Sequence, residues 1–248
     1  GKVKLIFQAG EEEDLGAKEV ISNHELDDVD YVFGLHVSPF VPSGFFATRG
    51  GVLMPSSSNF KIIVKGIGGH VSSPHSTIDP IFISSQIVNL LHGLTSRIIN
   101  PLEGFTLSIT SIHSGTRNNI IPDEAVMEGT VRSFDVFTLE KVKSQIKSLI
   151  DSLCKSFGAD CEVTFSDACP PLVNYPEITS RVTDILSNLR RPVVEIDPVM
   201  LADDFSRYLQ IKPGCYIFIG TRNKDKGCIY PTHSPLFKLD EDILKYGS

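Results

Sequence analysis

The order of strand and helix patterns in the middle of the chain restricts the possible fold more than any other feature. The expected elements are a strand at 59–66, a helix at 80–98, strands at 104–115 and 124–134, a helix from 138 to Gly158, and a strand at 161–167. This β-α-β-β-α-β order is that of the ferredoxin-like sandwich. At roughly 110 residues, the region is long enough to form a complete domain.

The two helices of this region carry start and stop signals. Asp79 is a suitable N-cap for the first helix, and Pro80 fits its first turn. Thr138 can cap the second helix, and Gly158 can end it. The apolar residues of the second helix follow the helical period, so we expect an amphipathic helix there.

The segments on either side of the sandwich have a different pattern. Residues 3–8, 30–37, 192–196 and 215–220 resemble short buried strands of α/β type, with helical patterns at 176–190 and 203–209. We expect residues 1–53 and 167–248 to form one α/β domain, into which residues 54–166 are inserted. At roughly 135 residues this α/β domain is small for such a sheet. Because the chain also starts directly on a strand, we expect the domain's N-terminal part to be missing.

Composition excludes several classes of protein. The 248 residues include 23 basic and 30 acidic side chains, a balance that argues against a nucleic-acid partner. No apolar run is long enough to span a membrane, and the N-terminal run is too short for a signal peptide. The five cysteines form no C-x-x-C pair and are odd in number. We interpret them as reduced, packed thiols of a cytoplasmic protein.

The run "FQAGEEEDLGA" at residues 7–17 places four acids directly after an expected strand. Such crowding is unfavourable unless water or a cation screens the charges. At the C-terminal end of a strand, Glu11 and Glu12 would point to opposite sides, so that one can bind a metal while the other acts as a base. The alternative is a solvated acidic loop.

Two histidines are further candidate ligands. His36 lies near the C-terminal end of an apolar strand, and His233 lies in a proline-flanked loop. A glutamate and two histidines suit zinc or manganese, although no local spacing connects these three residues. The alternatives are a hydrogen-bonded structural histidine for His36 and an exposed loop residue for His233.

The sandwich contributes three more candidates. The turn "GIGGHVSSPH" at residues 66–75 lacks the features of a phosphate loop, but its glycines can present His70 to a ligand. Asn119 lies in the polar turn "TRNNIIPD", and Arg132 on a strand can hold a carboxylate through two hydrogen bonds. A flexible turn and a surface arginine are the alternatives.

Six ordered motifs connect these candidates: "KLIFQAGEEEDLGAK", "VDYVFGLH", "GIGGHVSSPH", "NNIIPDEAVMEGTVRSF", "PVMLADDFSRYL" and "THSPLFKLDED". Together they resemble the metal-dependent amidohydrolase and carboxypeptidase family, which includes aminoacylases, hippurate hydrolases and auxin-conjugate hydrolases. The resemblance implies a zinc-peptidase-like α/β catalytic domain with an inserted lid and dimerisation domain. It also implies a homodimer and a small N-acyl amino acid or peptide as substrate.

The resemblance assigns a role to each candidate. It implies that Glu11 is the general base and that His70 polarises the scissile carbonyl. The implied metal ligands are Glu12, His36 and His233, and the implied substrate-binding residues are Asn119 and Arg132. The implied cofactors are two divalent ions, zinc or manganese, with cobalt as a further alternative.

The chain departs from the family pattern in two ways. Ala9 and Gly10 precede the glutamate pair, where the family has a proline before a small residue. Family members also carry an N-terminal segment with a metal-binding histidine and a bridging cysteine or aspartate, which this sequence lacks. We therefore expect a fragment of a hydrolase with little activity of its own. The alternative is a non-catalytic, dimerising family member with an incomplete metal site.

Overall fold

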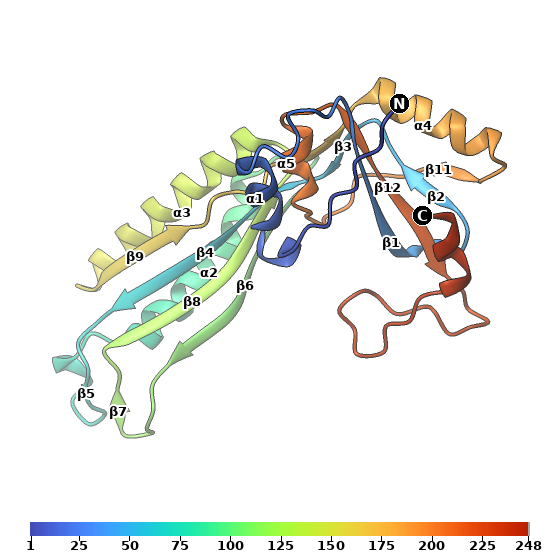
Figure 1. Cartoon of the computed structure of the whole chain (residues 1–248). Coiled ribbons are helices and arrows are strands. Elements are labelled where there is room, and N and C mark those ends of the chain that lie inside the picture. The colour runs from blue at the N-terminus through green and yellow to red at the C-terminus, as the bar shows by residue number, and fades with distance from the viewer. Residues whose placement is uncertain (248) are drawn as a thin grey trace. The chain divides into compact units, whose positions relative to one another are not determined.

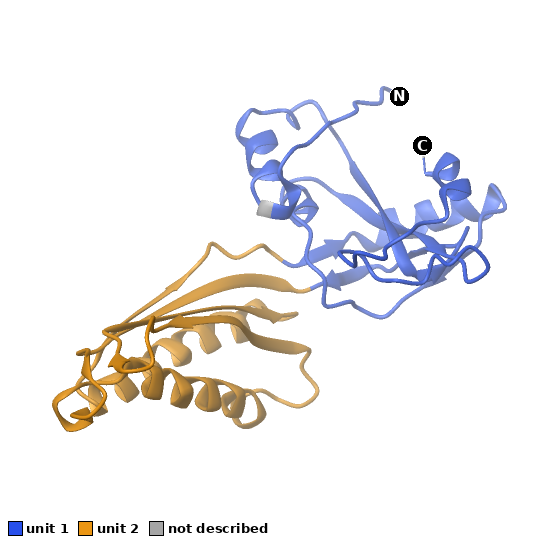
Figure 2. Ribbon diagram, turned by 90° about the horizontal axis from the view of Figure 1, so that it is seen from below, with its two compact units in different colours: residues 1–54, 171–248 blue, residues 55–170 orange. Residues whose placement is uncertain are grey.

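The computed structural model describes residues 1–247, apart from the side chain of Glu13. The chain divides into two compact units (Figure 2). Unit 1 consists of Gly1–Met54 together with the C-terminal residues from Pro171, and unit 2 is Pro55–Pro170. Unit 2 is therefore inserted in sequence between the two parts of unit 1. Its role as a lid and dimerisation domain stays a prediction.

Unit 2 is an antiparallel sheet covered by two helices (Figure 1). Its strands lie in the order β6-β8-β4-β9, with β4 at Ser56–Lys65, β6 at Phe105–Ser114, β8 at Glu124–Ser133 and β9 at Asp160–Phe165. Apolar residues of α2 (Pro80–Ile98) and α3 (Val136–Ser156) pack with the buried face of the sheet. The predicted β-α-β-β-α-β sandwich is confirmed.

The helix ends in unit 2 follow local chemistry, with one error in the prediction. The Asp79 side chain caps α2 by accepting from the backbone N–H groups of Ile81 and Phe82, as predicted. Thr138 does not cap α3. The cap is Asp135, whose carboxylate accepts from the backbone N–H of Thr138 at 2.8 Å. An ionised carboxylate three residues earlier is the stronger acceptor, and the Thr138 hydroxyl also donates to it.

The glycine-rich turn and the polar turn of unit 2 meet at one end of the sandwich. Strand β5 (Gly69–His70) pairs antiparallel with β7 (Ile120–Ile121), and a short helix, η2, covers Pro74–Ser76. The backbone N–H of Val71 donates to the carbonyl of Asn119 at 3.3 Å. The two segments that carry His70 and Asn119 are therefore neighbours.

Unit 1 is built on a mixed sheet in the order β1-β12-β2-β11. Its strands are β1 (Val32–Pro42), β2 (Phe46–Thr48), β11 (Val193–Glu195) and β12 (Gly214–Arg222), and β3 (Gly51–Met54) pairs separately with β10 (Leu172–Asn174). The helices are α1 (Gly16–Ser22), α4 (Pro176–Asn188), α5 (Phe205–Leu209) and the short η1 (Glu11–Glu13) and η3 (Glu241–Tyr246). The predicted strands at 30–37, 192–196 and 215–220 are confirmed.

The predicted strand at residues 3–8 is wrong. Residues 1–10 have no regular secondary structure, and the side chains of Val3, Leu5 and Phe7 are 88, 76 and 93% exposed. A strand exists only where a neighbouring strand accepts and donates its backbone hydrogen bonds. This segment has the apolar run of a buried strand, but it pairs with no strand within residues 1–247.

The cysteines and the helices add two observations. The five cysteines are all free thiols, and only Cys161 among them is partly exposed. Among residues 1–247, no helix has both the length and the apolar content that crossing a bilayer requires.

Candidate functional site

The glutamate pair lies in a tight helical turn rather than at a strand end. Gly10 and Asp14, on either side of η1, both adopt left-handed backbone conformations, with φ of 73° and 55°. Glycine reaches this conformation without strain, which explains Gly10 in place of a larger residue. The prediction that Glu11 and Glu12 alternate along an extended segment is therefore wrong. In the turn, Glu11 is half-buried and Glu12 is exposed.

Glu11 meets two acids that follow in sequence almost two hundred residues later. Carboxylate oxygens of Glu11, Asp203 and Asp204 all lie within 4.8 Å of one another. The pKa of Glu11 is raised from 4.5 to about 7, first by burial and then by the negative charges of Asp203, Glu12 and Asp204. His36 has the opposite effect and lowers the pKa of Glu11. Glu11 is thus not part of a fully solvated loop, and a cation beside it would relieve the crowding.

Asp203 and Asp204 are already held by hydrogen bonds. The Tyr216 hydroxyl donates to Asp203 Oδ2 at 2.5 Å, and the backbone N–H of Phe205 donates to Asp203 Oδ1 at 2.9 Å. Asp204 is buried and accepts from Gln8 and from the backbone of Ala17. Both residues lie in the motif "PVMLADDFSRYL", but the pattern of residues assigned them no role, because adjacent aspartates before a helix are ordinary capping residues.

His36 is presented by β1 in a defined tautomer. Its Nδ1 lies 2.7 Å from the carbonyl oxygen of Val37. A carbonyl oxygen only accepts, so Nδ1 must carry the hydrogen and the neutral ring leaves Nε2 with a free lone pair. A histidine whose other ring nitrogen donates to a carbonyl is typical of metal ligands.

Glu12 and His233 come together from opposite ends of the chain. His233 Nε2 lies 3.6 Å from Glu12 Oε1, and the two side chains are 75 and 76% exposed. His233 has a left-handed backbone, with φ of 65°, which is uncommon for a residue with a side chain. The structure thus brings two of the three predicted ligands into contact, and His36 near enough to act on Glu11.

Of the unit 2 candidates, His70 and Asn119 lie on neighbouring segments, and Arg132 does not lie with them. His70 Nδ1 accepts from the backbone N–H of Ser72 at 3.2 Å and lies 2.8 Å from the Ser72 hydroxyl. The hydrogen of the neutral ring is therefore on Nε2, which can donate to a ligand. Asn119 neighbours this turn, whereas Arg132 is the penultimate residue of β8, at the end of that strand remote from β7.

The predicted ligands carry donor types that suit a divalent metal ion, and the group of acids that converges within 4.8 Å among the described residues is Glu11, Asp203 and Asp204. Glu12 offers carboxylate oxygens, His36 offers a free Nε2, and His233 offers Nε2. Oxygen and imidazole donors of this kind suit zinc and manganese. Glu11 stands beside them as a carboxyl group whose pKa, about 7, is in the range of a general base.

Comparisons with known proteins agree on one family. The family model described as peptidase family M20/M25/M40 matches residues 1–247. Thermostable carboxypeptidase 1 of Saccharolobus solfataricus is 53% identical over 251 residues, which is 100% of this chain and 64% of that protein. N-acetyl-L-cysteine deacetylase of Bacillus subtilis is 35% identical over 244 residues, 98% of this chain and 58% of that protein.

A solved structure agrees with these relatives. The crystal structure of a Bacillus subtilis protein described as a dinuclear metal binding peptidase from the M20 family matches with a TM-score of 0.77 and 29% identity. The match covers 97% of this chain and 60% of that one. The present chain therefore spans less than two thirds of the length of these relatives.

Proposed function

The chain belongs to peptidase family M20/M25/M40, and from that premise we propose that it is part of a metal-dependent hydrolase that cleaves the amide bond of N-acyl amino acids or small peptides. The family resemblance inferred from the motifs is confirmed. The names of two relatives, a carboxypeptidase and an N-acetyl-L-cysteine deacetylase, both denote cleavage of an amide bond. The observation that carries the proposal is the 3.6 Å approach of His233 to Glu12.

Glu12, His36 and His233 are the proposed metal ligands, with Glu12 and His233 sharing one ion. When bound, a zinc or manganese ion, or alternatively cobalt, supplies a Lewis acid that polarises the scissile carbonyl. The relatives are longer than this chain. We therefore propose that the remaining ligands of a two-metal site come from residues outside this sequence, and that residues 1–248 are a fragment with little activity.

Side chains of this protein would carry out proton transfer, stabilise the developing charge and bind the substrate. Glu11 would take a proton from the attacking water and deliver it to the leaving amine. His70, with its hydrogen on Nε2, would donate to the carbonyl oxygen as negative charge develops there. Asn119 and Arg132 would hold the substrate's amide or free carboxylate.

A homodimer through the inserted domain, residues 54–166, is also part of the proposal. A monomeric mass by light scattering at micromolar concentration would count against it. The cytoplasmic location stays a prediction from the cysteine content.

The direct test uses the longest natural form of the protein, prepared metal-free and then reconstituted with zinc, manganese or cobalt. We expect bound metal by elemental analysis and hydrolysis of N-acetyl or N-benzoyl amino acids. Glu12→Gln and His233→Ala should each lose bound metal, while Glu19→Gln, an exposed glutamate on α1, should not. Absence of metal from the reconstituted wild type would contradict the proposal and favour the non-catalytic, dimerising family member.

A further inference from the structure

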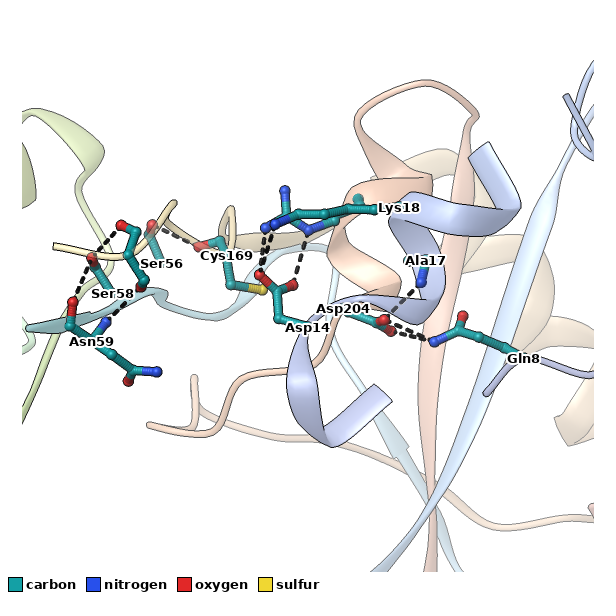
Figure 3. Close-up of polar contacts among 11 residues, drawn as sticks. Gln8, Asp14, Ala17, Lys18, Ser56, Ser58, Asn59, Cys169 and Asp204 are labelled. Atoms are coloured by element: carbon teal, nitrogen blue, oxygen red, sulfur yellow. Dashed lines mark hydrogen bonds and ion pairs between the residues drawn. The ribbon is translucent and has the colours of Figure 1, made fainter. Parts of the chain in front are cut away.

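One buried carboxylate holds both ends of the loop that carries Glu11 and Glu12. Gln8 Nε2 donates to Asp204 Oδ1 at 2.9 Å and to Oδ2 at 2.8 Å, and the backbone N–H of Ala17 donates to Oδ2 at 2.8 Å (Figure 3). Gln8 precedes the loop of residues 9–16, and Ala17 follows it. Asp204 therefore closes this loop at its base.

The surroundings of Asp204 fix the direction of these hydrogen bonds. Asp204 is 3% exposed, and Ala17 is fully buried. An ionised carboxylate only accepts, so the Gln8 amide nitrogen faces Asp204 and its Oε1 accepts from the Tyr208 hydroxyl. Hydrogen bonds to a buried charged acceptor are among the stronger ones in proteins, and a buried donor that loses its acceptor is costly.

A second contact, from helix α5, which begins directly after Asp204, holds the middle of the loop. Arg207 on α5 donates from Nε and Nη2 to the two carboxylate oxygens of Asp14, at 2.9 and 2.5 Å. Asp14 ends the η1 turn in its left-handed conformation. Helix α5, with Asp204 immediately before it, thus fixes the loop before, within and after the turn that carries the two glutamates.

We propose that Asp204 is a positioning residue that orders residues 9–16 and thereby sets the placement of Glu11 and Glu12 for metal binding. The inference rests on the proposed function for its second half only, since the ordering of the loop requires no metal. Asp204 is not itself a proposed ligand; its carboxylate accepts from the Gln8 amide and from the backbone N–H of Ala17.

The test variant is Asp204→Asn, which keeps the shape of the side chain and replaces one oxygen by an N–H donor. If the remaining oxygen still accepts from Ala17, the new amide nitrogen faces the Gln8 nitrogen, and two donors oppose each other. Adding Gln8→Glu restores an acceptor at that position, and Tyr208 still donates to it. The double variant carries the same net charge as the wild type, with the charge moved across the hydrogen bond.

The first measurement is amide hydrogen exchange of the metal-free protein over residues 9–17. We expect Asp204→Asn to speed exchange about tenfold and the double variant to return it close to wild type. Ile243→Val is the matched control, because it trims a buried side chain of unit 1 in a cluster with Phe46 and Ile219. Unchanged exchange in Asp204→Asn, or equal acceleration in the control, would overturn the inference.

The second measurement is zinc affinity of the longest natural form, by competition with a chelating dye. Loss of a residue that orients metal ligands typically weakens binding about 10- to 100-fold, and we expect this for Asp204→Asn, with recovery in the double variant. Equal zinc affinity in all variants would reduce Asp204 to a purely structural residue and overturn the positioning role. If the wild type binds no zinc, the proposed function fails, and the exchange experiment still decides whether Asp204 orders the loop.

Discussion

The two histidines that the proposed mechanism uses in different ways also differ in which ring nitrogen carries the hydrogen. In His36 the carbonyl of Val37 requires the hydrogen on Nδ1, which leaves Nε2 as an electron-pair donor. In His70 the backbone N–H of Ser72 requires an unprotonated Nδ1, which leaves Nε2 as a hydrogen donor. The first state suits a metal ligand, and the second suits a group that stabilises developing negative charge.

These tautomers are a prediction that nitrogen NMR can check without any activity. In protein labelled with ¹⁵N-histidine and held near pH 9, where an ordinary histidine is neutral, His36 should show hydrogen on Nδ1 and His70 on Nε2. His36→Gln and His70→Gln identify the two sets of signals. Ser72→Ala removes the hydroxyl that lies 2.8 Å from His70 Nδ1 and should leave the orientation of the ring less fixed. Ser73→Ala should not, because Ser73 contacts His70 through its backbone N–H, which alanine keeps. A reversed pair of tautomers would refute the assignment of roles.

Gly34, two residues before His36 on β1, is required by close packing. A Cβ added there would lie 2.9 Å from ring carbons of both Phe205 and Tyr216, which are buried. Gly34→Ala should therefore lower the free energy of unfolding by about 1–3 kcal/mol, as overpacking usually does. Urea unfolding measures this change.

Gly93 on α2 provides the matched control. An added Cβ there meets nothing within 4 Å, and alanine is the better helix former. Gly93→Ala should raise the free energy of unfolding by about 0.5–1 kcal/mol. Changes of the same sign at the two positions would show that crowding at Gly34 is not the cause.

At the level of secondary-structure elements, the sequence predicted best where the signal is local. Gly158 ends α3 because a left-handed residue is needed there, and its φ is 74°. The start of the same helix was harder to predict, because Asp135 and Thr138 lie three residues apart and both can cap. The segment at residues 3–8 has the apolar run of a buried strand, but whether it pairs depends on a neighbouring strand that no local pattern reveals.

The connection between β12 and η3, which carries His233, is fixed by one buried aspartate. Asp240 accepts from the Ser43 hydroxyl at 2.7 Å, from the Asn223 amide at 2.8 Å and from the Lys226 ammonium at 2.5 Å. These contacts, with Lys226 first, hold the pKa of Asp240 well below its usual value of 3.8. Asp240 should therefore anchor the loop in its ionised form.

A pH dependence of stability follows, because the folded pKa of Asp240 is depressed. Its contribution is fully present above the unfolded pKa, near 4, and is lost as the pH falls through the folded value. Asp240→Asn should thus melt below the wild type at pH 7, and the difference should shrink as the pH falls below about 4. Thermal unfolding across pH measures both. Lys226→Met should reduce the stability that is lost on acidification, because it removes a partner of the ionised Asp240. A difference in melting temperature between Asp240→Asn and wild type that stays constant with pH would refute the linkage.

For the whole molecule, the sequence alone predicted the sandwich of unit 2 better than the site of unit 1. The sandwich follows from periodicity within about 110 residues, whereas the site joins Glu12 to His233 from opposite ends of the chain. No spacing in the sequence connects those two, and only the family resemblance placed them together. The roles of Asp203 and Asp204 were missed for the same reason, since these roles depend on contacts with Gln8, Ala17 and Glu11, which are distant in the sequence.

The last prediction concerns how much of a metal site residues 1–248 can form alone. Glu12 and His233 are about three quarters exposed, so an ion between them would remain largely in water with few protein ligands. Metal affinity depends on the number of ligands and on how well the fold holds them. We therefore expect residues 1–248 to bind zinc at least about 100-fold more weakly than the longer form that we propose, and to turn over N-acyl amino acids little or not at all. Chelator competition and a hydrolysis assay on a preparation with Gly1 verified as its first residue check both points. Robust, chelator-sensitive hydrolysis by that preparation would show that this part of the family fold carries a complete site.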